Sequence, residues 1–199
     1  MRHLREFLTA FRKHKYDVVG DGSVLFPAQH VYASGMYTHR IRGKTDWVSD
    51  KNLLPTEGLT YMLDSFISSH AAIPLYLSLY ANATTPTAAW IQSTYPSSGI
   101  ALEIVAGTGG SGEGYNEATR VVWNSAAAVT ATKDNYASMA VFTIVTATTL
   151  LVNGVALHTA SAKGATTGSL ISATRFTAQR AFANTDLFDV KYQLALTST

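Results

Sequence analysis

The chain has 199 residues, enough for one large domain or for a domain with an arm, and it contains no cysteine. Disulfides, thiolate metal sites and a cysteine nucleophile are therefore excluded. Charged residues make up only 14% of the chain, against about 25% in an ordinary soluble domain. So little charge is typical either of a protein whose surface is largely covered by neighbours or of a β-rich soluble domain.

The positive charge is concentrated at the start of the chain. Residues 1–44 hold eight Lys or Arg against three acids, a net charge of +5, whereas residues 45–199 have a net charge of −3. A basic leading segment predicts contact with an acidic protein surface or, less favoured, with nucleic acid; the alternative is a solvated basic surface. No secretory signal or membrane span is expected, because the first residues lack an apolar core and prolines interrupt the uncharged stretch 65–102.

Residues 1–51 are expected to form an extended basic arm. Apolar residues recur at helical spacing near its start, which predicts a short amphipathic helix, and glycines and prolines then interrupt the pattern up to Gly43. An arm of this kind gains affinity by burying apolar side chains along a partner and by pairing its cations with acids. The residues expected to make these contacts are Arg2, Leu4, Arg5, Phe7, Leu8, Phe11, Arg12, Lys13, Lys15, Phe26, Tyr32 and Trp47.

Residues 56–69 are expected to form one helix packed on a sheet. Thr56 is the expected N-cap, and Glu57 stands in the first turn, where a negative charge suits the helix dipole. Gly58 opposes the helix by about 1 kcal/mol relative to alanine. The apolar residues that predict a single packing stripe are Leu59, Met62, Leu63, Phe66 and Ile67.

From residue 74 onward apolar and polar residues alternate, which predicts strands. Asn153–Gly154 inside an apolar run predicts a two-residue hairpin turn. Short strands without strand–helix alternation predict a mainly β body over residues 52–199, an antiparallel β-sandwich or jelly roll. The expected strands are 74–81, 100–106, 119–124, 138–145, 149–159, 168–176 and 187–196.

The stretch GTGGSG, residues 107–112, fits the G-x-G-x-x-G pattern of dinucleotide-binding loops. Such a loop needs a helix after it, whose free N–H groups face the phosphates. The residues that follow, EGYNEATRVVWN, have no helical stripe and lead into an expected strand. We therefore expect a glycine-rich loop between two strands and no nucleotide.

Other residues give little sign of chemistry. The six histidines show no spacing typical of a metal pair. Glu103, Glu113 and Glu117 have the residue type of a glycosidase pair, but nothing fixes their separation, and solvated carboxylates are expected. No catalytic residue, cofactor or metal is therefore expected. The aromatic residues of the middle third favour core packing over stacking on a sugar or base; they are Tyr76, Tyr80, Trp90, Tyr95, Tyr115 and Trp123.

Several motifs occur together in a familiar order. They include NLLPTEGLTYML (52–63), LYLSLYAN (75–82), NGVALH (153–158) and DLFDVKYQL (186–194). Between them stand Glu103, then Tyr115, Arg120 and Trp123. Over about 52–196 this pattern resembles a family of virion structural proteins of tailed bacteriophages, especially short-tailed ones. The resemblance implies a particle component and no enzyme.

A β-sandwich with an arm suits a decoration, or cement, protein on the head shell. Its expected partners are the major capsid protein and further copies of itself, and its expected location is the capsid surface after synthesis in the host cytoplasm. Two alternatives stay open: a tail or head–tail junction protein, and a receptor- or glycan-binding module with Trp90, Tyr95 and the 107–114 loop at its tip. Deletion of residues 1–44 is expected to leave a folded body that no longer binds heads.

Overall fold

A computed structural model describes residues 17–18, 24–25, 31–67 and 73–198. The chain divides into two compact units, one made of residues 1–33 with 196–199 and the other of residues 34–195, called the body below. In the first unit the described residues include two short antiparallel strands, β1 (Asp17–Val18) and β2 (Val24–Leu25). The expected helical turn around Leu4–Phe11 lies outside the described residues.

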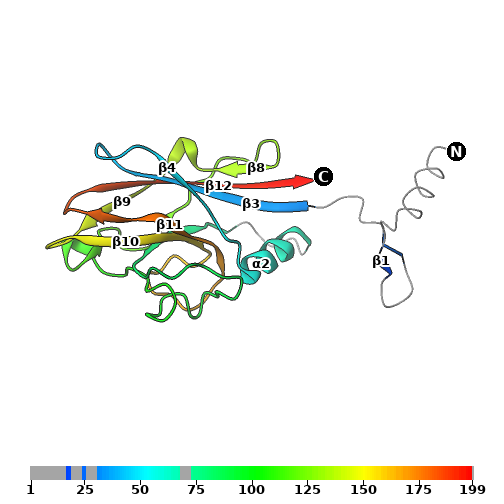
Figure 1. Ribbon diagram of the computed structural model, residues 1–199, viewed down its shortest axis with the longest axis horizontal. Coiled ribbons are helices and arrows are strands. Elements are labelled where there is room, and N and C mark those ends of the chain that lie inside the picture. The colour runs from blue at the N-terminus through cyan, green and yellow to red at the C-terminus, as the bar shows by residue number, and fades with distance from the viewer. Residues whose placement is uncertain (1–16, 19–23, 26–30, 68–72, 199) are drawn as a thin grey trace. The chain divides into compact units, whose positions relative to one another are not determined.

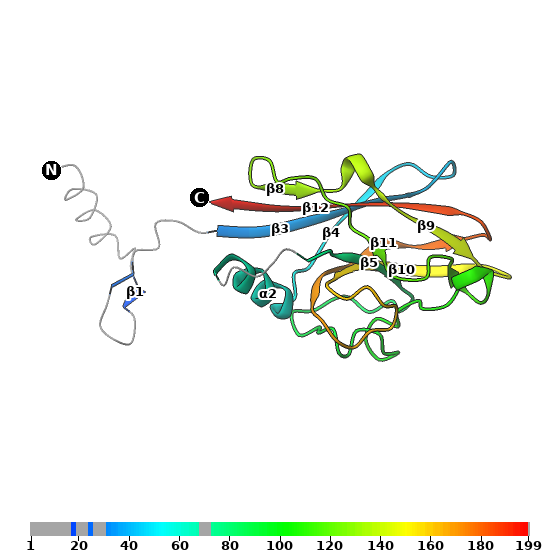
Figure 2. The same cartoon turned by 180° about the vertical axis from the view of Figure 1, so that it is seen from behind.

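The body is a sandwich of two antiparallel sheets (Figures 1 and 2), as predicted. The four-stranded sheet has the order β11 (Leu170–Phe182), β10 (Leu150–His158), β5 (Tyr76–Tyr80), β7 (Val121–Val122). The six-stranded sheet has the order β4 (Val48–Lys51), β3 (Val31–Ile41), β12 (Leu187–Ser198), β9 (Ala140–Val145), β6 (Gly114–Tyr115), with β8 (Thr132–Asp134) also paired to β12. The predicted strand 100–106 contributes only isolated bridges, from Glu103 to Tyr80 and from Ala106 to Gly114.

The main core lies between the two sheets. In the strands of the six-stranded sheet, side chains that point into the core alternate with side chains on the outer face. On β12, Phe188, Val190 and Tyr192 are buried, whereas Lys191 on the other face is only partly covered. The facing strands contribute further apolar side chains to the same cluster: Leu77, Leu79, Val152, Val155, Leu157, Ile171, Phe176 and Phe182.

The four-stranded sheet is buried on its second face as well. A second cluster there contains Tyr80, Trp90, Tyr95 and Leu170, contributed by the sheet and by residues of the 81–106 segment. Burial on both faces explains why β10 is apolar almost throughout instead of alternating. The predicted hairpin turn at Asn153–Gly154 is wrong. These residues lie inside β10, where the pairing with β11 shifts register between Val152 and Gly154.

Helix α2 (Thr56–Ile67) forms where it was predicted, with Glu57 in its first turn. Two residues of its predicted apolar stripe, Leu59 and Leu63, do not pack on the sheet. Gly58 is buried, and a Cβ there would stand 2.2 Å from the backbone oxygen of Ile171 on β11. The helix therefore packs through its glycine, while Leu59 and Leu63 remain 45% and 57% exposed.

The predicted boundary at residue 51 is also corrected. Residues 34–51 belong to the body, because β3 lies between β4 and β12 in the six-stranded sheet. His39 points into the core of this sheet, where its Nε2 lies 2.9 Å from an oxygen of Asp50 on β4. A polar residue at a core position, together with Gly35, obscured the alternation in the sequence. No helix in the described ranges is long and apolar enough to cross a membrane.

Candidate functional site

A chain of polar side chains runs through the buried outer layer of the four-stranded sheet. The hydroxyl of Tyr95 lies 2.8 Å from Ser78 Oγ, which lies 2.8 Å from Nε2 of His158. Nδ1 of His158 is 2.7 Å from Oε1 of Gln92, whose amide nitrogen donates to the carbonyl of Ala165. Because Gln92 Oε1 only accepts, His158 is protonated at Nδ1 and its Nε2 accepts from Ser78.

Ser78 and His158 have the spacing of a nucleophile and its general base, with Gln92 in the place of the orienting third group. The side chains of Ser78, Gln92, Tyr95 and His158 are nevertheless fully buried. Burial, with a smaller contribution from the charge of Arg120, holds the pKa of His158 well below its usual range. This closed network satisfies buried polar groups in the core and offers a substrate no access.

The buried neutral histidine predicts a loss of stability in mild acid. Below pH 6.5 the unfolded chain takes up a proton on His158 that the folded chain does not, so the free energy of unfolding falls as the pH falls. The fall is up to about 1.4 kcal/mol per pH unit for each such histidine. Urea unfolding between pH 7 and 5 measures it. His158→Gln is expected to reduce this slope, and an equal slope in the variant would contradict the assignment.

Glu103 and Arg120 form a buried ion pair next to this network. Arg120 Nε and Nη2 donate to the two carboxylate oxygens of Glu103 at 2.8 and 2.6 Å, and both side chains are fully buried. Arg120 also donates to the carbonyls of Ala160 and Ala165, and the amide of Gly164 donates to Glu103. The prediction of a solvated Glu103 was therefore wrong: the pair ties three loop segments together.

The other two carboxylates of the suggested glycosidase pair bind different segments. Glu113 accepts from Thr146 Oγ1 and the amide of Ala147, and these hydrogen bonds lower its pKa. Glu117 accepts from the amide of Thr143 at 3.1 Å. Each carboxylate thus caps backbone of the β9 region, and neither faces Glu103 across a cleft.

The GTGGSG stretch is a tight loop and, as predicted, no helix follows it directly. A three-residue 3-10 turn (Thr108–Gly110) is followed by β6, and Gly107 has a φ of 98° with its amide donating to Ser111. Lys163 closes the loop: its Nζ donates to the carbonyls of Tyr115 and Ala106 and lies 3.6 Å from the ring centroid of Tyr115. Partial burial lowers the pKa of Lys163 to about 8.

Trp47 lies on the outer face of the six-stranded sheet, between two cations. The guanidinium carbon of Arg40 is 4.4 Å and Nζ of Lys191 is 4.1 Å from the centroid of the Trp47 ring. Nζ of Lys191 also lies 5.4 Å from the ring of Tyr136, which is 40% exposed. We call Arg40, Trp47, Tyr136 and Lys191 the Trp47 surface. Its aromatic and cationic groups are held in place by one another.

Two of the acids near the Trp47 surface are paired with cations. Asp189 is fully buried and accepts hydrogen bonds from both Arg40 and Arg42. Lys44 pairs with Asp186 at 2.7 Å. Two arginines share the carboxylate of Asp189, whereas Asp46, the residue before Trp47, is an exposed acid.

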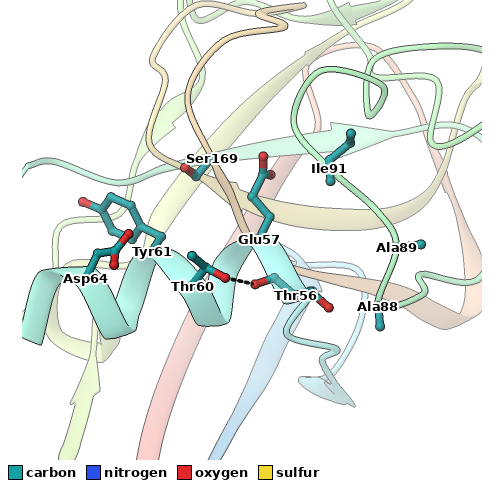
Figure 3. A pocket seen from close by; sticks show the side chains of 9 residues that line it. All are labelled: Thr56, Glu57, Thr60, Tyr61, Asp64, Ala88, Ala89, Ile91 and Ser169. Atoms are coloured by element: carbon teal, nitrogen blue, oxygen red, sulfur yellow. Dashed lines mark hydrogen bonds between the residues drawn. The ribbon is translucent and has the colours of Figure 1, made fainter.

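A second exposed feature is the outward side of α2, called the α2 face and formed by Thr56, Leu59, Thr60, Leu63 and Asp64. Beside it is a pocket of about 400 Å³ lined by the helix, by Ala88, Ala89 and Ile91, and by Ser169. Figure 3 shows Glu57 projecting from the first turn toward the Ile91 and Ser169 segments. Its Oε2 accepts from the amides of Gln92 and Leu170, both at 2.7 Å, so Glu57 holds the pocket walls together.

Of the predicted contact residues, the structure places the side chain of Trp47 alone. Tyr32 lies in β3, and its side chain is outside the description. The remaining ten fall outside the described residues: Arg2, Leu4, Arg5, Phe7, Leu8, Phe11, Arg12, Lys13, Lys15 and Phe26. The partners of Trp47 were missed, although the alternation of β12 would have placed Lys191 on the outer face.

The expected packing role of the aromatic residues is confirmed for Tyr80, Trp90, Tyr95, Tyr115 and Trp123, which are all buried. Trp90 and Tyr95 are therefore not exposed for stacking on a sugar ring. Within the described ranges, no group of three or more His, Asp or Glu side chains is placed to hold a metal ion. Comparison of the chain with protein-family models and with curated proteins returns no match, so its function is inferred below from its own residues.

Proposed function

We propose that this chain is a non-enzymatic structural protein of a short-tailed bacteriophage virion, a decoration protein that binds the head shell through its body and its basic leading segment. The observation that carries the proposal is the Trp47 surface: a tryptophan held between Arg40 and Lys191 on the outside of the sandwich, next to the exposed ring of Tyr136. The resemblance of residues 52–196 to virion proteins supplies the class of partner.

The chemistry of the Trp47 surface suits a protein partner. Tryptophan, tyrosine and arginine are the residues most enriched among those that dominate protein–protein binding energy. Side chains already fixed by cation–π contacts lose less conformational entropy on binding. Arg40 and Lys191 would meet acidic groups of coat subunits, which favours encounter and orientation.

Binding of purified protein to heads that lack it tests the proposal. Trp47→Ala is expected to weaken binding about 30-fold, corresponding to about 2 kcal/mol for a dominant contact residue. The affinity is measured by co-sedimentation across a concentration series, with circular dichroism to show that the variant is folded. Leu151→Ala, at an exposed apolar position on β10, is the control and is expected to bind like the parent chain. Unchanged binding by Trp47→Ala would remove the Trp47 surface from the interface.

The contribution of the leading segment to binding is tested by a deletion that leaves β3 intact. Removing residues 1–44 would take away β3 and unfold the six-stranded sheet. Removing residues 1–30 keeps all of β3 and is expected to leave a folded body with reduced occupancy on heads. Full occupancy by this shorter chain would show that the leading segment is not needed.

The number of copies in each virion separates a decoration protein from a head–tail junction protein. A decoration protein is present in hundreds of copies, whereas a ring at the portal or tail has about a dozen or fewer, as closed symmetry sets. Gel densitometry against the major capsid protein measures this ratio.

A further inference from the structure

The α2 face has the character of a docking surface for an amphipathic, basic segment. Leu59 and Leu63 stand four residues apart, so they lie on one side of the helix, and they remain 45% and 57% exposed. Asp64 is exposed beside them, and Glu57 lines the adjoining pocket. The helix contains no lysine or arginine, which gives this side of the body a net charge of −2 from α2 alone.

Residues 1–16, MRHLREFLTAFRKHKY, have the complementary character. Leu4, Phe7, Leu8 and Phe11 recur at the i, i+3, i+4, i+7 spacing with which a segment anchors itself on an apolar helix surface. Five Lys or Arg against one Glu give these sixteen residues a net charge of +4. Apolar spacing and charge therefore both match the α2 face.

We propose that residues 1–16 of one copy bind the α2 face of a second copy, with apolar side chains against Leu59 and Leu63 and cations toward Asp64 and the acidic pocket. Residues 1–33 are assigned to a unit other than the body. Exchange of such a segment between identical chains is a low-cost route to an oligomer. This contact between copies is separate from binding to heads and is tested on purified protein without heads. The contact between copies and the proposed function can therefore fail independently of each other.

The absence of native cysteine allows a direct test by disulfide trapping in the full-length chain. Thr9→Cys labels the leading segment and Thr60→Cys labels the α2 face, and both leave the apolar residues intact. The two variants are mixed, one with a mass tag that identifies the mixed dimer, and oxidised mildly. Thr149→Cys is the matched control, exposed in the β9–β10 connection at the end of the sandwich away from α2 (Figures 1 and 2).

The mixed dimer of Thr9→Cys with Thr60→Cys is expected to form at least about tenfold faster than that with Thr149→Cys, because a bound segment raises the local thiol concentration to the millimolar range. Adding Leu59→Ser and Leu63→Ser to the Thr60→Cys chain is expected to reduce the rate to that of the control. Asp64→Lys is expected to reduce it several-fold at low salt.

Equal rates at Thr60→Cys and Thr149→Cys would show random collision and overturn the proposal. A chain with both Thr9→Cys and Thr60→Cys distinguishes a second copy from the same chain: exchange gives linked dimers and larger species, whereas an internal link gives only monomers and would also overturn it. Thermal unfolding of each variant verifies folding, which exposed positions on α2 should preserve. If Thr60→Cys is unstable, Leu63→Cys reports on the same face.

Discussion

Replacing Arg120 with methionine is expected to lower the free energy of unfolding by about 3–5 kcal/mol, the cost of leaving one member of a buried ion pair alone. The carboxylate of Glu103 would keep the amide of Gly164 as a donor and lose both guanidinium contacts. The carbonyls of Ala160 and Ala165 would also lose the Arg120 donor. Urea denaturation at pH 7 measures the change.

Two comparisons make this prediction specific. The double variant Glu103→Leu/Arg120→Met is expected to recover much of the loss, because an apolar pair removes the uncompensated buried charge. Lys44→Met breaks an exposed ion pair with Asp186 and is expected to cost at most about 1 kcal/mol. A loss below about 1 kcal/mol in Arg120→Met would mean that water reaches Glu103 and that the pair is not sealed.

Replacing Gly154 with alanine is expected to cost about 3 kcal/mol, at the upper end of the usual range for overpacking a core. A Cβ at this position would stand 2.2 Å from Cζ of Tyr80 on β5 and 2.3 Å from the carbonyl oxygen of Thr174 on β11. Neither side can give way easily, since Tyr80 is fully buried and its hydroxyl donates to that same carbonyl. Strands β5, β10 and β11 would have to move apart.

Gly99→Ala is the matched control for this variant. Gly99 is exposed and a Cβ there meets no atom within 4 Å, so a change within about 0.5 kcal/mol is expected. Thermal or urea unfolding of the two variants, compared with the parent chain, gives both values. If Gly154→Ala were as stable as Gly99→Ala, the close approach of β5, β10 and β11 at this point would be wrong.

The sequence alone was enough to predict those elements whose pattern reflects their own burial. The apolar side chains of β12 pack on one face, so they alternate with polar ones and the position of the strand was predicted almost to the residue. Helix α2 was found because a 3.6-residue period and an acidic first turn are local properties, although Leu59 and Leu63 of that period are exposed. The absence of cysteine excluded a whole class of sites without any structure.

The tertiary structure decided where polar and glycine residues go, because their role depends on segments far away in the chain. His39 is tolerated at a core position of β3 because it forms a hydrogen bond with Asp50 on β4. Glu103 is buried because it pairs with Arg120, seventeen residues later in the chain. Gly58 faces β11 while Leu59 and Leu63 point outward, and Gly154 allows a close approach of three strands where a hairpin was predicted. Trp47 likewise belongs to a surface of the body because Lys191, on a strand at the other end of the chain, lies against its ring. The sequence shows which residue types repeat along a segment. The group that pairs with a buried charge, or the strand that packs against a glycine, is determined only when distant strands pack together.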